Sequence, residues 1–98
     1  METVVQETLR AGLGHHRAGR LAEAEKNYRK VLEADPQNAE ALHLLGLAAY
    51  HGNRPERAIE LISDALINDP GNVKYIVNLG GAYQASGNTD DAARCYRQ

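Results

Sequence analysis

The sequence predicts an all-α protein built as a solenoid of stacked antiparallel helix pairs. Three observations carry the prediction. The motif Asp-Pro-x-Asn occurs at residues 35–38 and again, 34 residues later, at 69–72. Each copy leads into an apolar stretch that ends in Leu-Gly. Between the motifs, apolar residues recur at three- and four-residue steps, which is the period of an amphipathic helix, and no segment alternates as a strand would.

Composition limits both the fold and the partners. The 98 residues suffice for one small domain, and 43% of them are hydrophobic. The chain has five tyrosines but no Trp or Phe, so its core must consist mainly of Leu, Ala, Val and Ile, which favours close-packed helices. The net charge is -2, with basic and acidic residues interspersed. We therefore expect neither nucleic acid nor a membrane surface as partner, because both attract concentrated positive charge.

The cysteine content and the N-terminal residues bear on location. The single Cys95 permits no internal disulfide and no cysteine-based metal site, which is consistent with a reducing compartment. The first ten residues contain no apolar run of signal-peptide length. No stretch approaches the roughly 18 apolar residues of a membrane-spanning helix. We therefore expect a soluble, cytoplasmic protein.

The chain divides into three copies of one unit, at residues 5–38, 39–72 and 73–98, of which the last is truncated. We treat them as one domain over residues 1–98. The copies match well beyond their prolines. Residues that align at 34-residue steps are Gly12, Gly46 and Gly80; Ala24, Ala58 and Ala92; and Tyr28, Ile62 and Tyr96. A period of this length is typical of a solenoid made of helix pairs.

Each unit is predicted to contain two helices separated by a short turn. The turn of the second unit is HGNRPE, at residues 51–56. Equivalent positions in the three turns hold Gly19, Asn53 and Gly87. These residue types tolerate the left-handed conformation at a helix end. Pro55 suits the first turn of the following helix, and Thr89 is expected to cap the last helix.

The Asp-Pro-x-Asn motifs are predicted to form the joints between units. Pro36 and Pro70 lack an N–H and disfavour helix in the residue before them, so each should end one helix pair. Asn38 and Asn72 can cap the helix that begins the next pair.

Small residues predict close packing within each pair. We expect a glycine of the first helix to approach an alanine of the second, with larger side chains filling the space around them. The predicted pairs are Gly12 with Ala24, Gly46 with Ala58, and Gly80 with Ala92.

These residues resemble the tetratricopeptide repeat, whose 34-residue units are helix–turn–helix. The second unit carries the pattern at Leu42, Leu45, Gly46, Ala49, Ala58, Ile62 and Pro70. The third carries it at Ile76, Leu79, Gly80, Tyr83, Ala92 and Tyr96, and the first more weakly at Thr8, Ala11, Gly12, His15, Ala24, Tyr28 and Pro36. The resemblance covers nearly the whole chain, as about two and a half to three units. It implies a right-handed α-solenoid whose first helices line a concave groove and whose second helices form the convex back.

The resemblance also implies a protein-binding scaffold that holds a peptide or a partner helix in this groove, and not an enzyme. The predicted groove residues are Leu9, Leu13, His16, Arg17, His43, Leu47, Tyr50, His51, Lys74, Val77 and Asn78. Apolar side chains on a face that the core does not need suggest a binding surface. The alternative is that some of them pack between neighbouring first helices.

Two ligand patterns of the family are largely missing from this sequence. Members that bind the terminal carboxylate of chaperone tails use a Lys/Asn/Arg clamp. The corresponding positions of the first unit hold Leu9 and Leu13, Leu44 follows at a later position, and only Lys74 fits the clamp. Members that resemble O-linked N-acetylglucosamine transferases line the groove with asparagines, and Asn78 alone occupies such a position.

The histidines do not make a convincing metal site. His15 occupies the inter-helix aromatic position of its unit, and adjacent histidines on a helix point about 100° apart, so His15 and His16 cannot easily share an ion. His16, His43 and His51 can instead gather on the groove side as a pH-sensitive rim. No Ser or Cys accompanies a His/Asp pair in a glycine-rich elbow, and no P-loop is present. We expect no bound metal, no cofactor and no catalysis.

The third unit ends inside its second helix, without a closing proline or a polar capping helix. Because each unit of a solenoid covers its neighbour, we expect this open end to expose residues near Tyr83, Ala92, Cys95 and Tyr96. We interpret the chain as the N-terminal piece of a longer protein. Three functions stay open: a peptide-binding scaffold, a non-catalytic substrate-docking arm of a transferase, and an element that self-associates through its open end.

Overall fold

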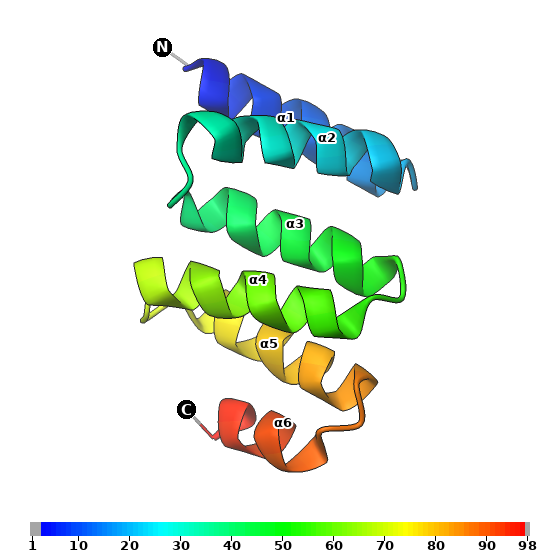
Figure 1. The fold of residues 1–98 in the computed structure, drawn as a ribbon, viewed down its shortest axis with the longest axis vertical. Coiled ribbons are helices and arrows are strands. Elements are labelled where there is room, and N and C mark those ends of the chain that lie inside the picture. Colours follow the sequence, from blue (N-terminus) through cyan, green and yellow to red (C-terminus); the bar gives the residue numbers. More distant parts are fainter. Residues whose placement is uncertain (1–2, 98) are drawn as a thin grey trace.

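A computed structural model describes residues 3–97 and forms six helices within them (Figure 1). In chain order they are α1 (Val4–Arg17), α2 (Leu21–Ala34), α3 (Ala39–His51), α4 (Pro55–Asn68), α5 (Val73–Ala85) and α6 (Thr89–Tyr96). No strand occurs between residues 3 and 97. The all-α prediction is confirmed.

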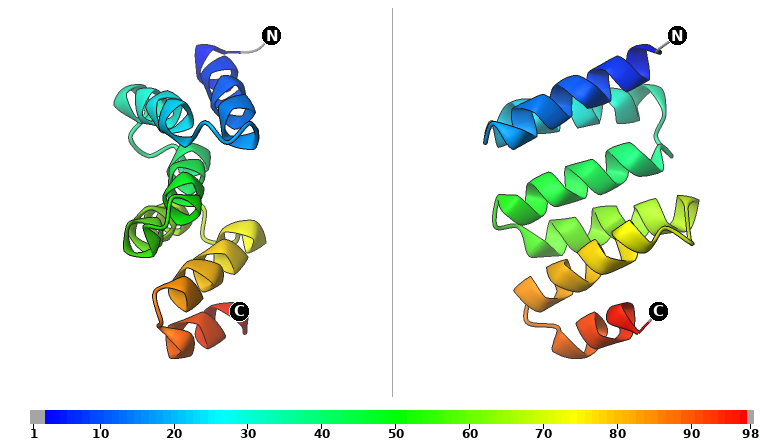
Figure 2. Two further views of the ribbon diagram at one scale, coloured as in Figure 1. Left: turned by 90° about the vertical axis from the view of Figure 1, so that its right-hand side faces the viewer. Right: turned by 180° about the vertical axis from the view of Figure 1, so that it is seen from behind.

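The helices pack as consecutive antiparallel pairs, α1 with α2, α3 with α4 and α5 with α6 (Figure 1). Neighbouring pairs meet where α2 packs on α3 and α4 packs on α5. The result is an elongated helical repeat of 41 × 26 × 18 Å. Seen along the helices, α1, α3 and α5 lie on one side and α2 and α4 on the other, with α3 set back between α1 and α5 (Figure 2). None of the helices described is long and apolar enough to cross a membrane.

The turns within the pairs repeat one geometry, and the prediction for them is confirmed. Gly19, Asn53 and Gly87 all have positive φ, at 80°, 64° and 86°. In the second turn, the Asn53 N–H donates to the Tyr50 carbonyl at 3.1 Å and the Arg54 N–H to the Ala49 carbonyl at 2.8 Å. This hydrogen-bond pattern closes a helix and satisfies its last carbonyls. Helix α4 then begins at Pro55, as expected.

The joints between pairs also behave as predicted. Asn38 Oδ1 accepts the Ala41 N–H at 2.9 Å, and Asn72 Oδ1 accepts the Tyr75 N–H at 3.2 Å. Helices α2 and α4 end before Pro36 and Pro70 are reached. Each motif therefore stops one helix pair and caps the next.

The predicted cap of the last helix is wrong by one residue. Asn88 is the N-cap of α6, and Thr89 is the first helical residue. No side-chain hydrogen bond caps this helix. The Asn88 amide donates to Ser86 Oγ at 2.9 Å, so this side chain is engaged with the preceding turn.

The glycines do permit close approach within each pair, but their nearest partners differ from the predicted alanines. A Cβ added at Gly46 would lie 2.7 Å from Ile62 Cγ1, and the nearest Ala58 atom would be its carbonyl oxygen at 3.4 Å. At Gly12 the nearest atom is Tyr28 Cε1, and at Gly80 it is Tyr96 Cε1, both at 2.6 Å. The large side chain one turn beyond each alanine therefore fills the space over each glycine.

The prediction for the C-terminal end is correct only for part of its surface. Tyr96 is 48% exposed and Tyr83 is half-buried. Ala92 and Cys95 are buried, contrary to expectation, because α6 turns both of them toward α5.

Candidate functional site

A hollow of about 630 Å³ lies along α1 and reaches the first turn of α3. Its lining residues are Gln6, Leu9, Arg10, Leu13, Gly14, Arg17 and Glu40. Those from α1 recur at three- and four-residue steps, so they form one continuous face of that helix. Its lining therefore comes from two first helices, α1 and α3. These helices and α5 lie on one side of the molecule (Figure 2).

The hollow brings together three of the predicted groove residues, with an apolar floor and a charged rim. Leu9 is buried and Leu13 half-buried, and both pack in or against the hydrophobic core. Arg17 is exposed at the rim. The list of predicted groove residues lacks the other four, although the spacing of three of them along one face of α1 could have identified them. The four are Gln6, Arg10, Gly14 and Glu40.

Three predicted groove residues of α3 lie in its second half, beyond the hollow. Leu47 and Tyr50 are half-buried against the core, whereas His51 is exposed. Tyr50 packs toward Gly81 of α5, where an added Cβ would lie 3.3 Å from Tyr50 Cε2. The small Gly81 thus leaves room for the tyrosine ring between neighbouring first helices.

His43 is buried between α3 and α5 and does not face an open groove. It is 3% exposed, its ring stacks on Tyr75 with centroids 4.4 Å apart, and its Nε2 lies 2.7 Å from the Asn78 amide nitrogen. Burial, and secondly the charge of Lys74, lowers the pKa of His43 to about 4. The imidazole is therefore neutral at physiological pH, and for this residue the alternative of packing between first helices holds.

The repeat explains why the groove prediction included a buried residue. Leu9, His43 and Val77 occupy equivalent positions at 34-residue steps. The first two are 5% and 3% exposed, whereas Val77 is 50% exposed. His43 contacts residues of α5, and no further helix follows α6 in the described residues to cover Val77. Lys74, one turn earlier, is exposed as well.

His16 and His51 form a separate pair. His16 Nε2 lies 2.8 Å from His51 Nδ1, and the two rings meet edge to face with centroids 5.0 Å apart. His16 Nδ1 lies 3.2 Å from Tyr28 Oη. Burial, and secondly the charge of His51, lowers the pKa of His16. His43, with its own partners, belongs to a different cluster.

His15 points elsewhere, although it adjoins His16 in sequence. It is half-buried, as expected for its position, and its Nδ1 accepts a hydrogen bond from Arg20 Nε at 3.0 Å. Across residues 3–97, no group of three or more His, Cys, Asp or Glu side chains is arranged to hold a metal ion.

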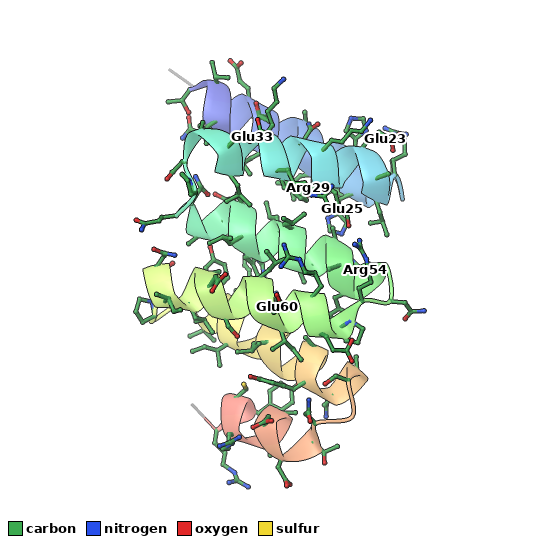
Figure 3. All side chains as sticks on the ribbon, in the orientation of Figure 1. Glu23, Glu25, Arg29, Glu33, Arg54 and Glu60 are labelled. Atoms are coloured by element: carbon green, nitrogen blue, oxygen red, sulfur yellow. The ribbon has the colours of Figure 1, made fainter. Side chains whose placement is uncertain are left out.

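A buried carboxylate ties the first two pairs together on the opposite side. Glu25 of α2 is 8% exposed and accepts hydrogen bonds from Arg54, at the start of α4, and from Arg29, the latter at 3.5 Å (Figure 3). The side chains of Glu25 and Arg54 point toward each other between their helices. The two arginines therefore pair with the Glu25 carboxylate, and its contact with Arg54 connects the first helix pair to the second.

The chain matches models of a known repeat family over most of its length. The tetratricopeptide repeat matches residues 9–73 and, in a second model of the same name, residues 76–98. Among curated proteins, BBSome complex member BBS4 of Bos taurus is 34% identical over 79 residues, which are 81% of this chain and 15% of that protein.

Solved structures share the fold. A crystal structure of MamA superposes with a TM-score of 0.89 at 24% identity, covering 96% of this chain and 55% of that one. The second TPR of Spaghetti (RPAP3), bound to the HSP90 peptide SRMEEVD, superposes with a TM-score of 0.90 at 20% identity, covering 95% and 86%. The chain thus spans about half of the MamA chain and a small part of BBS4.

Proposed function

The chain belongs to the tetratricopeptide repeat family, and from this premise we propose that it is a protein-interaction scaffold that binds a peptide or a partner helix on its concave side. The observation that carries the proposal is the hollow along α1. It combines an apolar floor, at Leu9 and Leu13, with a rim that includes Arg17 and Glu40. Such a combination can bury an apolar side chain of a partner while charged groups fix its orientation.

The related structures support this class of function. The second TPR of Spaghetti (RPAP3) holds an HSP90 peptide, and its fold matches this chain over 95% of the length. At 20% identity the likeness supports the mode of binding and not the ligand. Leu9 and Leu13 stand where a carboxylate clamp would need polar side chains, so we propose a partner that is anchored by an apolar residue.

A catalytic role is not part of the proposal. Cys95 is buried, and burial, opposed secondly by the charge of Arg94, raises the pKa of its thiol. A buried thiol with a raised pKa is a poor nucleophile. If the chain serves as the docking arm of a larger enzyme, the same hollow would hold the substrate protein, and the experiment below applies unchanged. A cytoplasmic site of action also belongs to the proposal, and cell fractionation would test it.

The proposal is tested by selecting peptides from a displayed library on the purified chain and measuring the affinity of a selected peptide by fluorescence anisotropy. We expect Leu13→Glu to weaken binding at least tenfold, because it places a charge on the apolar floor. Arg17→Glu, at an exposed rim position, should weaken binding without any risk to the core. Ile67→Glu is the matched control, since Ile67 is an apolar residue of α4 that is 75% exposed outside the hollow.

Circular dichroism of each variant establishes that the helices persist. The proposal would be contradicted if the selected peptide bound with equal affinity to the unmodified chain, to Leu13→Glu and to Arg17→Glu. An equally large loss of affinity in Ile67→Glu would contradict it too.

A further inference from the structure

The pair His16–His51 joins two different repeats through ring nitrogens that face each other. His16 lies in the last turn of α1, and His51 is the last residue of α3. Their nearest nitrogens, His16 Nε2 and His51 Nδ1, are 2.8 Å apart. Each neutral imidazole has one N–H and one nitrogen with a free lone pair, so these two facing nitrogens share a single hydrogen atom.

We propose that His16 and His51 together bind a borderline divalent transition-metal ion such as Zn²⁺, which bridges α1 and α3. Imidazole nitrogen is a preferred ligand of such ions. Two nitrogens that each lie about 2.0–2.1 Å from a tetrahedral zinc are about 3.3 Å from each other. From the observed 2.8 Å the separation would grow by about 0.5 Å, and both rings would tilt so that their lone pairs converge on the ion. The exposed His51 side chain has room to adjust.

Tyr28 supplies the outer contact that orients the first ligand. If His16 carries its proton on Nδ1, that N–H donates to Tyr28 Oη, which lies 3.2 Å away, and the lone pair on Nε2 points at His51. Metal-binding histidines commonly make this kind of second hydrogen bond, because it sets both the tautomer and the ring orientation. Tyr28 has no exposed surface and lies under Gly12, so its position is well defined.

Binding requires only that one proton moves within His51. When the ion takes the place of the shared hydrogen, the His51 proton moves from Nδ1 to Nε2, and Nδ1 then offers its lone pair to the metal. No net proton release is therefore needed from the two neutral rings.

The site has two protein ligands, so its affinity should be lower than that of a closed four-ligand zinc site. The other coordination positions are left to water, or to a carboxylate of a partner bound in the hollow. Arg17, which lines the hollow, follows His16 directly in sequence. A bound ion would fasten the first helix pair to the second at one end of the hollow.

The test is calorimetric titration of the untagged chain with Zn²⁺ alone, combined with a thermal melt. We expect one ion per chain and a rise in melting temperature that grows with zinc concentration, because an ion that binds only the folded state stabilises it. His51→Ala should weaken binding at least tenfold, and this exposed position carries little risk to folding. His15→Ala is the matched control: it removes a neighbouring histidine whose Nδ1 is bonded to Arg20, and it should bind zinc as the unmodified chain does.

The proposal is overturned if zinc produces no heat and no stabilisation, or if His51→Ala binds as tightly as the unmodified chain. It is also overturned if His15→Ala weakens binding as much as His51→Ala. Tyr28→Phe should weaken binding by a smaller factor, because it removes only the outer hydrogen bond.

Discussion

Replacing Gly46 by alanine tests the packing within the central helix pair. The added Cβ would lie 2.7 Å from Ile62 Cγ1 and 3.3 Å from Leu61 Cβ, whereas carbon atoms pack best at about 3.5–4.0 Å. Ile62 has no exposed surface and cannot swing away. Overpacking of this kind costs about 1–3 kcal/mol. Alanine returns about 1 kcal/mol through its better helix propensity.

The net effect of Gly46→Ala is therefore a destabilisation of up to about 2 kcal/mol. In a domain of this size, that loss lowers the melting temperature by up to roughly 16 °C. Gly14→Ala is the matched control, since Gly14 is also helical but an added Cβ there meets nothing within 4 Å. This control should gain about 0.5–1 kcal/mol. Thermal melts and urea titrations of the three proteins decide the matter. If Gly46→Ala is as stable as Gly14→Ala, the close contact between α3 and α4 does not require a glycine at position 46.

Three further substitutions follow from the structure. The pKa of His43 is about 4 in the folded protein, against 6.5 ordinarily. Between these pH values the unfolded chain binds more protons than the folded one, so the free energy of unfolding falls by about 1–3 kcal/mol as the pH drops through this range. His43→Leu should flatten this part of a stability–pH curve, and an unchanged slope would argue against a buried neutral imidazole. Glu25→Ala should lower the free energy of unfolding, measured by urea titration, by about 1–2 kcal/mol because it removes the acceptor of Arg54. A double-mutant cycle with Arg54→Ala that shows no coupling would refute the pairing. Asn72→Ala should cost about 1 kcal/mol, because it removes the cap of α5, and unaltered stability would mean that the cap contributes nothing.

Much of the fold could be predicted because it rests on local chemistry repeated at a fixed interval. Gly19, Asn53 and Gly87 recur where the chain needs a positive φ, and Asn38 and Asn72 recur where a helix begins. These requirements involve residues close together in the chain. The error at Thr89 is local as well: Asn88 and Thr89 are both residue types that begin helices, and sequence does not distinguish them.

The candidate site could be predicted only in part, because burial depends on which helix lies next to a position. Leu9, His43 and Val77 are equivalent in sequence, yet two are buried and one is exposed. The pairing of His43 with Asn78 spans 35 residues and two repeats. The same separation in sequence joins His16 to His51, and neither contact has a signal in the local pattern.

The sequence alone determined that this protein is a stack of helix pairs with a 34-residue pitch, since helix periodicity, caps and turn residues act over a few positions. Only the tertiary structure decided which side chain fills the space over each glycine, that His43 is enclosed while His51 is open, and where the hollow lies along α1. The reason is physical. Hydrogen bonds of turns and caps form within one element, whereas burial and side-chain pairing depend on the distance between helices, and that distance is set by all the side chains packed between them.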